Sequence, residues 1–172
     1  MENRSDLKRI VTIGLFIAIE IILTRFCSIN TPILRIGFGF LPVSMVAIMY
    51  GPLWAGAAYA IGDVLGMMIF PTGGDYFFGF TVSAALTGLI FGLVLHKKAI
   101  TYPRALIAAC IVCLGVNLIV DTYWLYLLTG QGFWVLLPAR VIKVAFAIPV
   151  QTLLIPLVWN TSIKKIFAAA NA

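Results

Sequence analysis

Long apolar runs separated by short polar segments dominate the sequence. A helix that crosses a bilayer needs about 20 mostly apolar residues. Helices and closed barrels are the structures that satisfy the backbone in lipid, and the runs lack the alternating pattern of barrel strands. The pattern predicts spanning helices over residues 7–26, 77–95, 104–128 and 135–163, and one or two more within residues 36–70.

The positions of the basic residues indicate how many helices residues 36–70 form. Loops rich in lysine and arginine stay on the cytoplasmic side of a membrane. The basic clusters are Arg4, Lys8 and Arg9; Lys97, Lys98 and Arg104; and Lys164 and Lys165. All three clusters are cytoplasmic only if Gly51-Pro52 is a turn that divides the stretch into helices over residues 39–50 and 53–70.

The sequence therefore predicts an all-α integral membrane protein, a bundle of six transmembrane helices with both termini cytoplasmic. Residues 1–172 form a single domain. The helix over residues 39–50 is short, so it requires tilting, local thinning of the bilayer, or cover by protein. The segments 28–38, 71–76 and 129–134 are the longest outer loops.

The composition supports lipid as the solvent for much of the surface. Of the 172 residues, 62% are hydrophobic and only 10% are charged, whereas about a quarter of a soluble chain is charged. The net charge of +6 does not indicate a nucleic-acid-binding protein, because the excess basic residues lie in the three cytoplasmic clusters.

Eight further charged residues balance one another. They are Arg25, Arg35, Arg140 and Lys143, and Glu20, Asp63, Asp75 and Asp121. The six-helix topology places all of them in the outer half of the membrane or in outer loops. A charge inside a bilayer costs several kcal/mol unless it is paired or hydrated, so such residues usually mark a function. They predict a polar cavity open to the outside; the alternative is a set of structural ion pairs between helices, with Asp63 packed between Gly62 and Gly66.

Aromatic residues lie at the same level. Residues 75–81 (Asp-Tyr-Phe-Phe-Gly-Phe-Thr) follow a loop pattern, and Trp124 lies near Asp121. Asn117 and Asp121 share one helix face, as do Arg140 and Lys143. This set suits a flat heteroaromatic ligand with acid groups. The aromatic side chains can stack on its ring, a carboxylate can accept hydrogen bonds from its ring N–H groups, and arginines can hold its carboxylates. The alternative for the rings is an interfacial aromatic belt.

Motifs of catalysis are missing from the sequence. No glycine-rich loop ends in Gly-Lys-Ser/Thr, and the single histidine, His96, is expected to be solvated beside Lys97. The sequence predicts neither an enzyme nor a cofactor or metal of its own. Cys110-x-x-Cys113 is a redox or metal pair, or two small apolar residues one turn apart; the second interpretation is favoured. Uphill transport would need a partner or an ion gradient.

Small residues on two predicted helices permit close helix approach. Gly14 and Ala18 lie four apart in the first, and Ala55, Ala58 and Gly62 follow in the 53–70 segment. They indicate either a docking surface for a partner or internal packing.

Several segments resemble the substrate-binding subunits (S components) of energy-coupling factor (ECF) vitamin transporters. They are residues 35–42 (Arg-Ile-Gly-Phe-Gly-Phe-Leu-Pro), 50–52 (Tyr-Gly-Pro), 62–66 (Gly-Asp-Val-Leu-Gly) and 71–81. Residues 117–125 and 136–143 resemble the folate-specific branch. The similarity covers nearly the whole chain and depends on the order and spacing of the segments. Phe78 departs from the family, which has proline there.

The resemblance implies a six-helix subunit of a bacterial plasma membrane that binds folate from outside. It implies that the subunit docks on a membrane coupling protein, which is joined to two cytoplasmic ATPases that use the ATP. It also implies that the subunit topples in the membrane to release the vitamin inside. The family docks through the small-residue face that maps to Gly14 and Ala18. Together, the charge pattern and the resemblance predict the binding residues Arg25, Arg35, Asp63, Asp75, Tyr76, Phe77, Phe80, Thr81, Asn117, Asp121, Trp124, Arg140 and Lys143.

Three alternatives remain at this stage. One is an S component for another vitamin, such as riboflavin or pantothenate, although riboflavin has no carboxylate to pair with the predicted cations. Another is a stand-alone ion-coupled carrier or channel. The third is a membrane-embedded enzyme.

Overall fold

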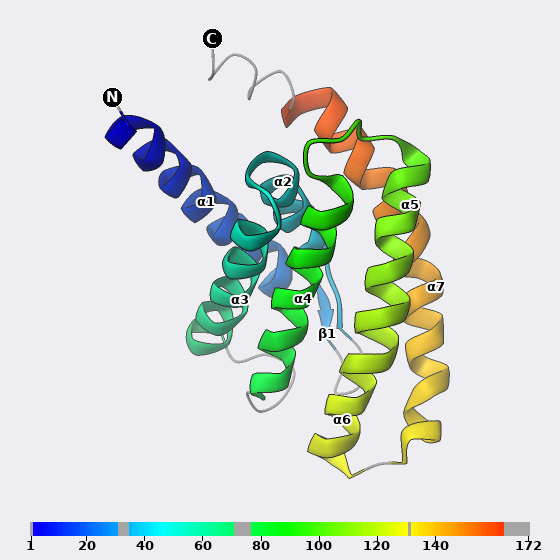
Figure 1. Cartoon of the computed structure of the whole chain (residues 1–172). Helices are drawn as coiled ribbons and strands as arrows, with labels where there is room; N and C mark the ends of the chain where they lie inside the picture. Colours follow the sequence, from blue (N-terminus) through cyan, green and yellow to red (C-terminus); the bar gives the residue numbers. More distant parts are fainter. Residues whose placement is uncertain (1, 31–34, 71–76, 131, 164–172) are drawn as a thin grey trace.

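The computed structural model describes residues 2–30, 35–70, 77–130 and 132–163. Within them the helical elements form six consecutive rods (Figure 1). These are α1 (Glu2–Arg25), α2 (Phe40–Tyr50), α3 (Pro52–Ile69), α4 (Phe78–Leu95), the continuous rod α5–η1–α6 (Tyr102–Cys110, Ile111–Val120, Asp121–Thr129), and α7 (Phe133–Val158) extended by η2 (Trp159–Ile163). The prediction of six helices is confirmed, although α1 begins at Glu2 rather than at residue 7.

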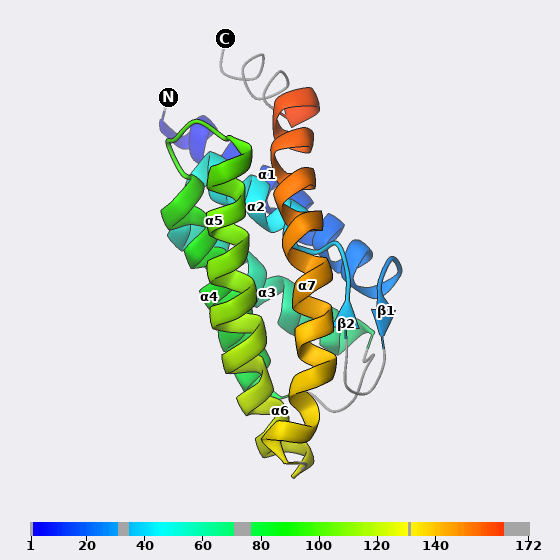
Figure 2. The ribbon, with the colours of Figure 1, turned by 90° about the vertical axis from the view of Figure 1, so that its right-hand side faces the viewer.

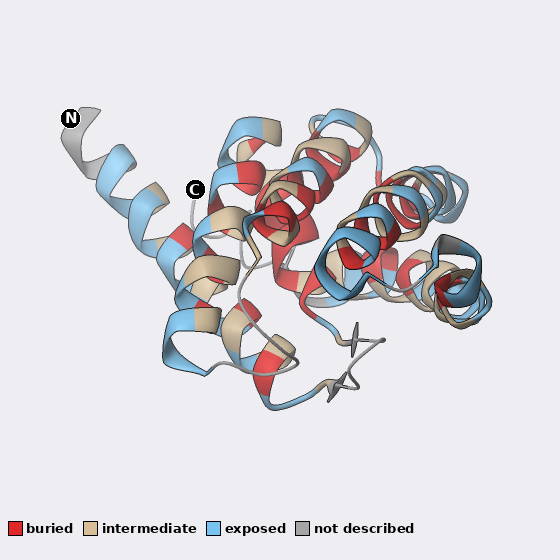
Figure 3. Cartoon of the chain, turned by 90° about the horizontal axis from the view of Figure 1, so that it is seen from below, coloured by how far each residue is buried: buried red, intermediate tan, exposed pale blue. Residues whose placement is uncertain are grey.

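Four of the described helices are long and apolar enough to cross a membrane. They are Pro52–Ile69, Phe78–Leu95, Tyr102–Thr129 and Trp134–Thr161. Large apolar side chains cover their outward faces, among them Leu53, Met68, Val135 and Phe146. Figure 3 shows buried residues on the faces that helices turn toward one another and exposed residues on the outside. The apolar surface therefore faces outward, as lipid requires.

Protein covers the short helix α2. Residues 42–48 are all buried, and α2 packs against α1, α3, α4 and α7. Of the three solutions that the sequence left open for this helix, the fold uses cover by protein. Gly51, with φ of +94°, forms the predicted turn into α3, a conformation that glycine adopts without strain.

Helices α3 and α4 pack with their backbones in contact. A Cβ atom on Gly88 would overlap the backbone of Ala55, and one on Gly92 would overlap Pro52. The small residues Ala55 and Ala58 of α3 are buried. The small residues of α3 therefore serve internal packing, whereas Gly14 of α1 has nothing within 4 Å of its Cβ position.

A short antiparallel ladder lies in the connection from α1 to α2, where the sequence predicted a loop. β1 (Ile29–Asn30) pairs with β2 (Arg35–Ile36), with Ile29 opposite Ile36 and Asn30 opposite Arg35. Two-residue strands give too little alternation for a sequence pattern to reveal them.

The basic residues gather at one end of the bundle. α1 begins and η2 ends at the same end, which also carries the connection between α4 and α5 with Lys97 and Lys98 (Figure 1). We call it the basic end. The junctions from α3 to α4 and from α6 to α7 lie at the opposite end, and Figure 2 shows α7 running beside the α5–η1–α6 rod between the two ends.

His96 belongs to the packing of the basic end. The sequence placed it in solvent, but its ring is half-buried. Its Nδ1 lies 3.1 Å from the carbonyl oxygen of Ile48, and its ring lies over Gly51. The expectation was wrong because the α2–α3 turn, distant in sequence, folds against the end of α4.

Candidate ligand-binding site

An acid and a base face each other between α6 and α7 without pairing. Asp121 is the first residue of α6 and is 9% exposed, and Arg140 of α7 is 5% exposed. Asp121 Oδ1 and Arg140 Nε are both buried without a hydrogen-bond partner among the described residues. The two charges nevertheless lie close enough to interact electrostatically.

Further charges act on the Asp121 carboxylate. Lys143, one turn beyond Arg140 on α7, attracts it, and Asp63 of α3 repels it. A buried charge left without hydrogen bonds costs several kcal/mol. Such a cluster is destabilising when empty and is stabilised by a ligand that brings complementary polar groups. It is therefore a candidate binding site.

Aromatic rings lie beside the charged cluster. The rings of Phe77 and Trp124 are 5.8 Å apart at an angle of 54°, and those of Phe77 and Phe80 are 6.1 Å apart at 74°. The Nε1 atom of Trp124 is buried without a partner among the described residues. The rings join the start of α4 to α6 and offer apolar faces next to Asp121, which suits a flat ring.

Gly79 makes room for the Trp124 indole. A Cβ atom at this position would lie 2.6 Å from Trp124 Cδ2. We expect Gly79→Ala to displace the indole and to weaken ligand binding about tenfold, because overpacking costs roughly 1–3 kcal/mol. Titration of the protein with ligand by calorimetry measures this. Gly115→Ala is the matched control, since nothing lies within 4 Å of its Cβ position; equal affinities for the two variants would remove Trp124 from the site.

Two hydroxyl residues of α4 lie near different acids of the cluster. Thr81 Oγ1 donates a hydrogen bond of 2.9 Å to Asp63 Oδ2 of α3. Ser83 lies close to the Asp121 carboxylate but makes no hydrogen bond of good geometry, and its Oγ is buried without a partner among the described residues. Asp63 and Thr81 therefore meet, as the predicted site requires.

A second polar layer lies nearer the basic end. Asn117 Nδ2 donates to Cys113 Sγ at 3.9 Å, and the thiol of Cys113 also lies near Gln151 of α7. Gln151 is buried, and its Oε1 lacks a partner among the described residues. Asn117 belongs to η1, a π-helical segment of ten residues; π-helical turns are rare and frequent at functional sites.

The cysteines form no disulfide. Cys27, Cys110 and Cys113 are free thiols, and the described residues contain no group of ligands that could hold a metal ion. Cys113 is buried beside Asn117, in agreement with the interpretation of small apolar residues in a helix.

Glu20 and Arg25 lie on a different surface, where α1 crosses α3. Glu20 Oε1 accepts a hydrogen bond of 2.7 Å from Thr24 Oγ1, and a Cβ on Gly62 would overlap its carboxylate. Arg25 Nη1 donates to Met67 Sδ at 3.1 Å, and its guanidinium lies against Gly66. Gly62 and Gly66 are therefore recesses for the charged side chains of α1.

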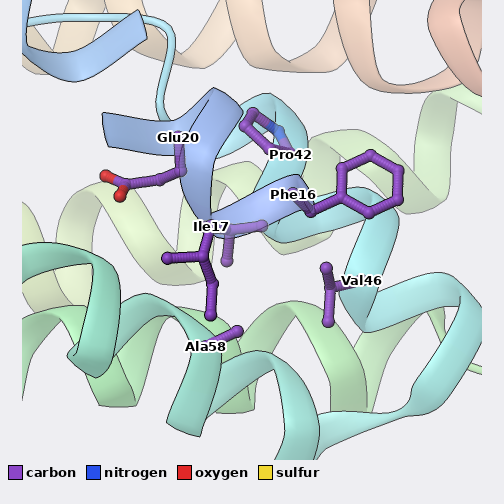
Figure 4. A pocket seen from close by; sticks show the side chains of 7 residues that line it. Phe16, Ile17, Glu20, Pro42, Val46 and Ala58 are labelled. Atoms are coloured by element: carbon purple, nitrogen blue, oxygen red, sulfur yellow. The ribbon is translucent and has the colours of Figure 1, made fainter. Parts of the chain in front are cut away.

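A small cavity separates Glu20 from the core. Its lining comes from α1, α2 and α3, namely Phe16, Ile17, Glu20, Pro42, Val43, Val46 and Ala58. Figure 4 shows the Glu20 carboxylate turned away from Phe16 and Val46. An almost wholly apolar lining does not suit a ligand with acid groups.

The described part of the eight-charge set thus falls into two groups. Asp63, Asp121, Arg140 and Lys143 gather between α3, α6 and α7, whereas Glu20 and Arg25 lie between α1 and α3. Of the other predicted residues, Asp75 and Tyr76 lie outside the described residues, and Arg35 is described only as part of β2. Ser83, Thr122 and Gln151 are buried polar residues that the sequence analysis missed. Serine, threonine and glutamine carry no formal charge, so the search for charges in lipid passed over them.

Comparison with known families identifies the chain. Residues 8–159 match the family model described as "ECF transporter, substrate-specific component". The chain belongs to this family. Its membership confirms the recognition made from the sequence, and it confirms a role in binding and transport rather than in catalysis.

Relatives of this S component are named for folate. It is 45% identical over 150 residues to "Folate transporter FolT" of Clostridium novyi (strain NT), covering 87% of each chain. It is 30% identical over 174 residues to a protein of the same name from Leuconostoc mesenteroides subsp. mesenteroides, covering 95% of this chain and 93% of the relative. A solved structure, "Crystal structure of FolT bound with folic acid", superposes with a TM-score of 0.84 at 35% identity, covering 89% of this chain and 93% of that one.

Proposed function

We propose that this S component captures folate from outside the cell and delivers it inward as part of an ECF-type ABC importer. The observation that carries the proposal is the buried pair Asp121 and Arg140, whose Oδ1 and Nε atoms have no partner among the described residues, beside the rings of Phe77 and Trp124. The relatives named for folate and the likeness to a FolT with bound folic acid support the choice of ligand.

Folate supplies what the described side chains lack. Its pterin ring carries N–H groups that a carboxylate accepts, and Asp121 stands next to two aromatic rings on which the pterin stacks. Folate also carries a ring carbonyl oxygen and two carboxylates, which are acceptors that complement the cations Arg140 and Lys143 near Asp121. Without ligand, Asp121 Oδ1 and Arg140 Nε are buried and have no partner among the described residues, so binding relieves an existing cost.

A competition series tests the ligand. Purified protein is extracted, and the released small molecule is identified by mass spectrometry; the proposal expects folate or a reduced folate. Unlabelled folic acid should then displace labelled folic acid, while riboflavin and pantothenate should not. Riboflavin lacks the carboxylates that would complement the cations of the site. Displacement by riboflavin at equal concentration contradicts the assignment.

We place the site end of the bundle outside the plasma membrane and the basic end in the cytoplasm. The positive-inside rule supports this orientation, since Lys97 and Lys98 lie at the same end as the start of α1. Cysteine labelling of Lys97→Cys in intact cells tests it. Reaction with an impermeant reagent from outside would reverse the orientation and contradict capture from the exterior.

The partners in the proposal are a membrane coupling protein and two cytoplasmic ATPases. The surface offered to the coupling protein is the face of α1 with Gly14 and Ala18, both of which are exposed. We expect Gly14→Leu to abolish folate uptake in cells that contain the whole transporter, because the larger side chain prevents close helix approach. Folate affinity of the isolated subunit should stay unchanged, since Gly14 has no neighbour within 4 Å of its Cβ position.

Ala145→Leu is the control for that variant, because it enlarges an exposed residue of α7 away from α1. Normal uptake with Gly14→Leu would move the docking surface elsewhere. Uptake by the subunit alone in liposomes, without ATPases, would favour the stand-alone carrier instead.

A further inference from the structure

Ser83, like Thr122, differs from most hydroxyl residues of the described helices. Hydroxyl groups inside helices usually donate to the carbonyl oxygen one turn earlier. Five threonines of this chain do so, namely Thr12, Thr24, Thr87, Thr129 and Thr152. Ser83 is 4% exposed, and its Oγ has no partner in the described part of the chain.

The surroundings of Ser83 are those of the binding site. Its side chain lies beside the Asp121 carboxylate, whose Oδ1 is also without a partner among the described residues. Ser83 lies one turn beyond Gly79, the residue over which Trp124 packs. A buried polar atom without a hydrogen bond costs roughly 1–3 kcal/mol, so the adjacent Ser83 hydroxyl and Asp121 Oδ1 indicate that a third polar group belongs between them.

We infer that Ser83 is a further ligand-binding residue, which together with Asp121 recognises the amino-oxo pyrimidine edge of the pterin ring. The inference rests on the proposed function. That edge presents an amino group and a ring N–H next to a carbonyl oxygen. A carboxylate only accepts hydrogen bonds, so Asp121 takes the N–H groups; the neighbouring carbonyl oxygen needs a donor, which the Ser83 hydroxyl supplies.

This arrangement also orients the ligand. The pterin end lies between α4 and α6, against Ser83, Asp121 and Trp124. Because a buried site built to bond a polar group rejects an analogue that lacks it, Ser83 and Asp121 would make the site selective for the pterin end.

The test compares Ser83→Ala with Thr87→Val by measuring dissociation constants for three ligands. Thr87 is also buried on α4, but its hydroxyl already donates to the Ser83 carbonyl oxygen at 2.9 Å. The ligands are folic acid, pteroic acid, which lacks the glutamate, and 2-desamino-2-methylfolic acid, which lacks the ring amino group.

We expect Ser83→Ala to weaken binding of folic acid and pteroic acid alike, by about 5- to 100-fold. Its effect on the desamino analogue should be clearly smaller, because the edge that Ser83 and Asp121 share is already broken. Thr87→Val should bind all three ligands as the unmodified protein does. Ser83→Cys, which keeps the volume and a weak donor, should fall between, and it replaces Ser83→Ala if that variant does not fold.

Unchanged folic acid affinity in Ser83→Ala would overturn the inference. So would a penalty that vanishes with pteroic acid, since Ser83 would then contact the glutamate end. An equal penalty with the desamino analogue would separate Ser83 from the pyrimidine edge and would also overturn it. If the unmodified protein binds neither folic acid nor pteroic acid, that result contradicts the proposed function instead.

Discussion

Arg140→Ala will weaken folate binding by about 2–5 kcal/mol, which corresponds to a loss of roughly 30- to 5,000-fold in affinity. Arg140 is 5% exposed on α7, and its Nε has no hydrogen-bond partner among the described residues. Its guanidinium is therefore available to the ligand. Removing it leaves a ligand carboxylate or carbonyl oxygen desolvated without a donor. Calorimetric titration of the purified subunit with folic acid measures the loss.

Two further variants serve as controls for this experiment. Arg140→Lys keeps the charge but not the planar pair of donors, so its affinity should fall between those of the original protein and Arg140→Ala. Arg104→Ala removes an arginine at the basic end, where it donates to the Ala99 carbonyl oxygen at 3.2 Å, and should leave affinity unchanged. Full affinity in Arg140→Ala would exclude Arg140 from the site.

Asp121→Asn is expected to change binding and stability in opposite directions. The isosteric amide cannot accept from two ring N–H groups, so folate affinity should fall by roughly 10- to 150-fold, the range of a lost charged hydrogen bond. Without ligand, the same change removes a buried carboxylate whose Oδ1 has no partner among the described residues. The apparent Tm of the empty subunit in detergent should therefore rise.

The sign of the stability change decides between two roles of Asp121. If Asp121 ties helices together through an ion pair, neutralising it will destabilise the empty protein. If Asp121 is instead held ready for a ligand, neutralising it will stabilise the empty protein, as happens where function and stability conflict. Asp6→Asn, at the exposed partner of Arg9, controls for a general effect of removing an acid. A lower Tm together with unchanged folate affinity would assign Asp121 to the structural role.

The site joins residues whose partners are far apart in the sequence. Ser83 and Asp121 belong to separate rods, as do Asp63 and Thr81. Periodicity places each of them on a face of its own helix but says nothing about which helix that face meets. For the same reason Glu20 and Arg25, which share a depth with Asp121 by the sequence argument, lie instead over Gly62 and Gly66 on α3.

The sequence by itself determined the six helices, the turn at Gly51-Pro52 and the grouping of basic residues at one end. The length of an apolar run and the distribution of basic residues between loops can be read from the sequence, and the bilayer constrains both. It also selected Asp121, Arg140 and Trp124 as candidates, because charges in an apolar segment are conspicuous.

Only the tertiary structure decided the cover of α2, the packing of His96 on the α2–α3 turn, and the separation of Arg25 from the Asp121 cluster. It alone distinguished Ser83, whose hydroxyl has no partner among the described residues, from Thr87, whose hydroxyl is bonded within its own helix. The reason is physical: whether a buried polar atom has a partner depends on the neighbouring helices, and that neighbourhood is set by packing in three dimensions.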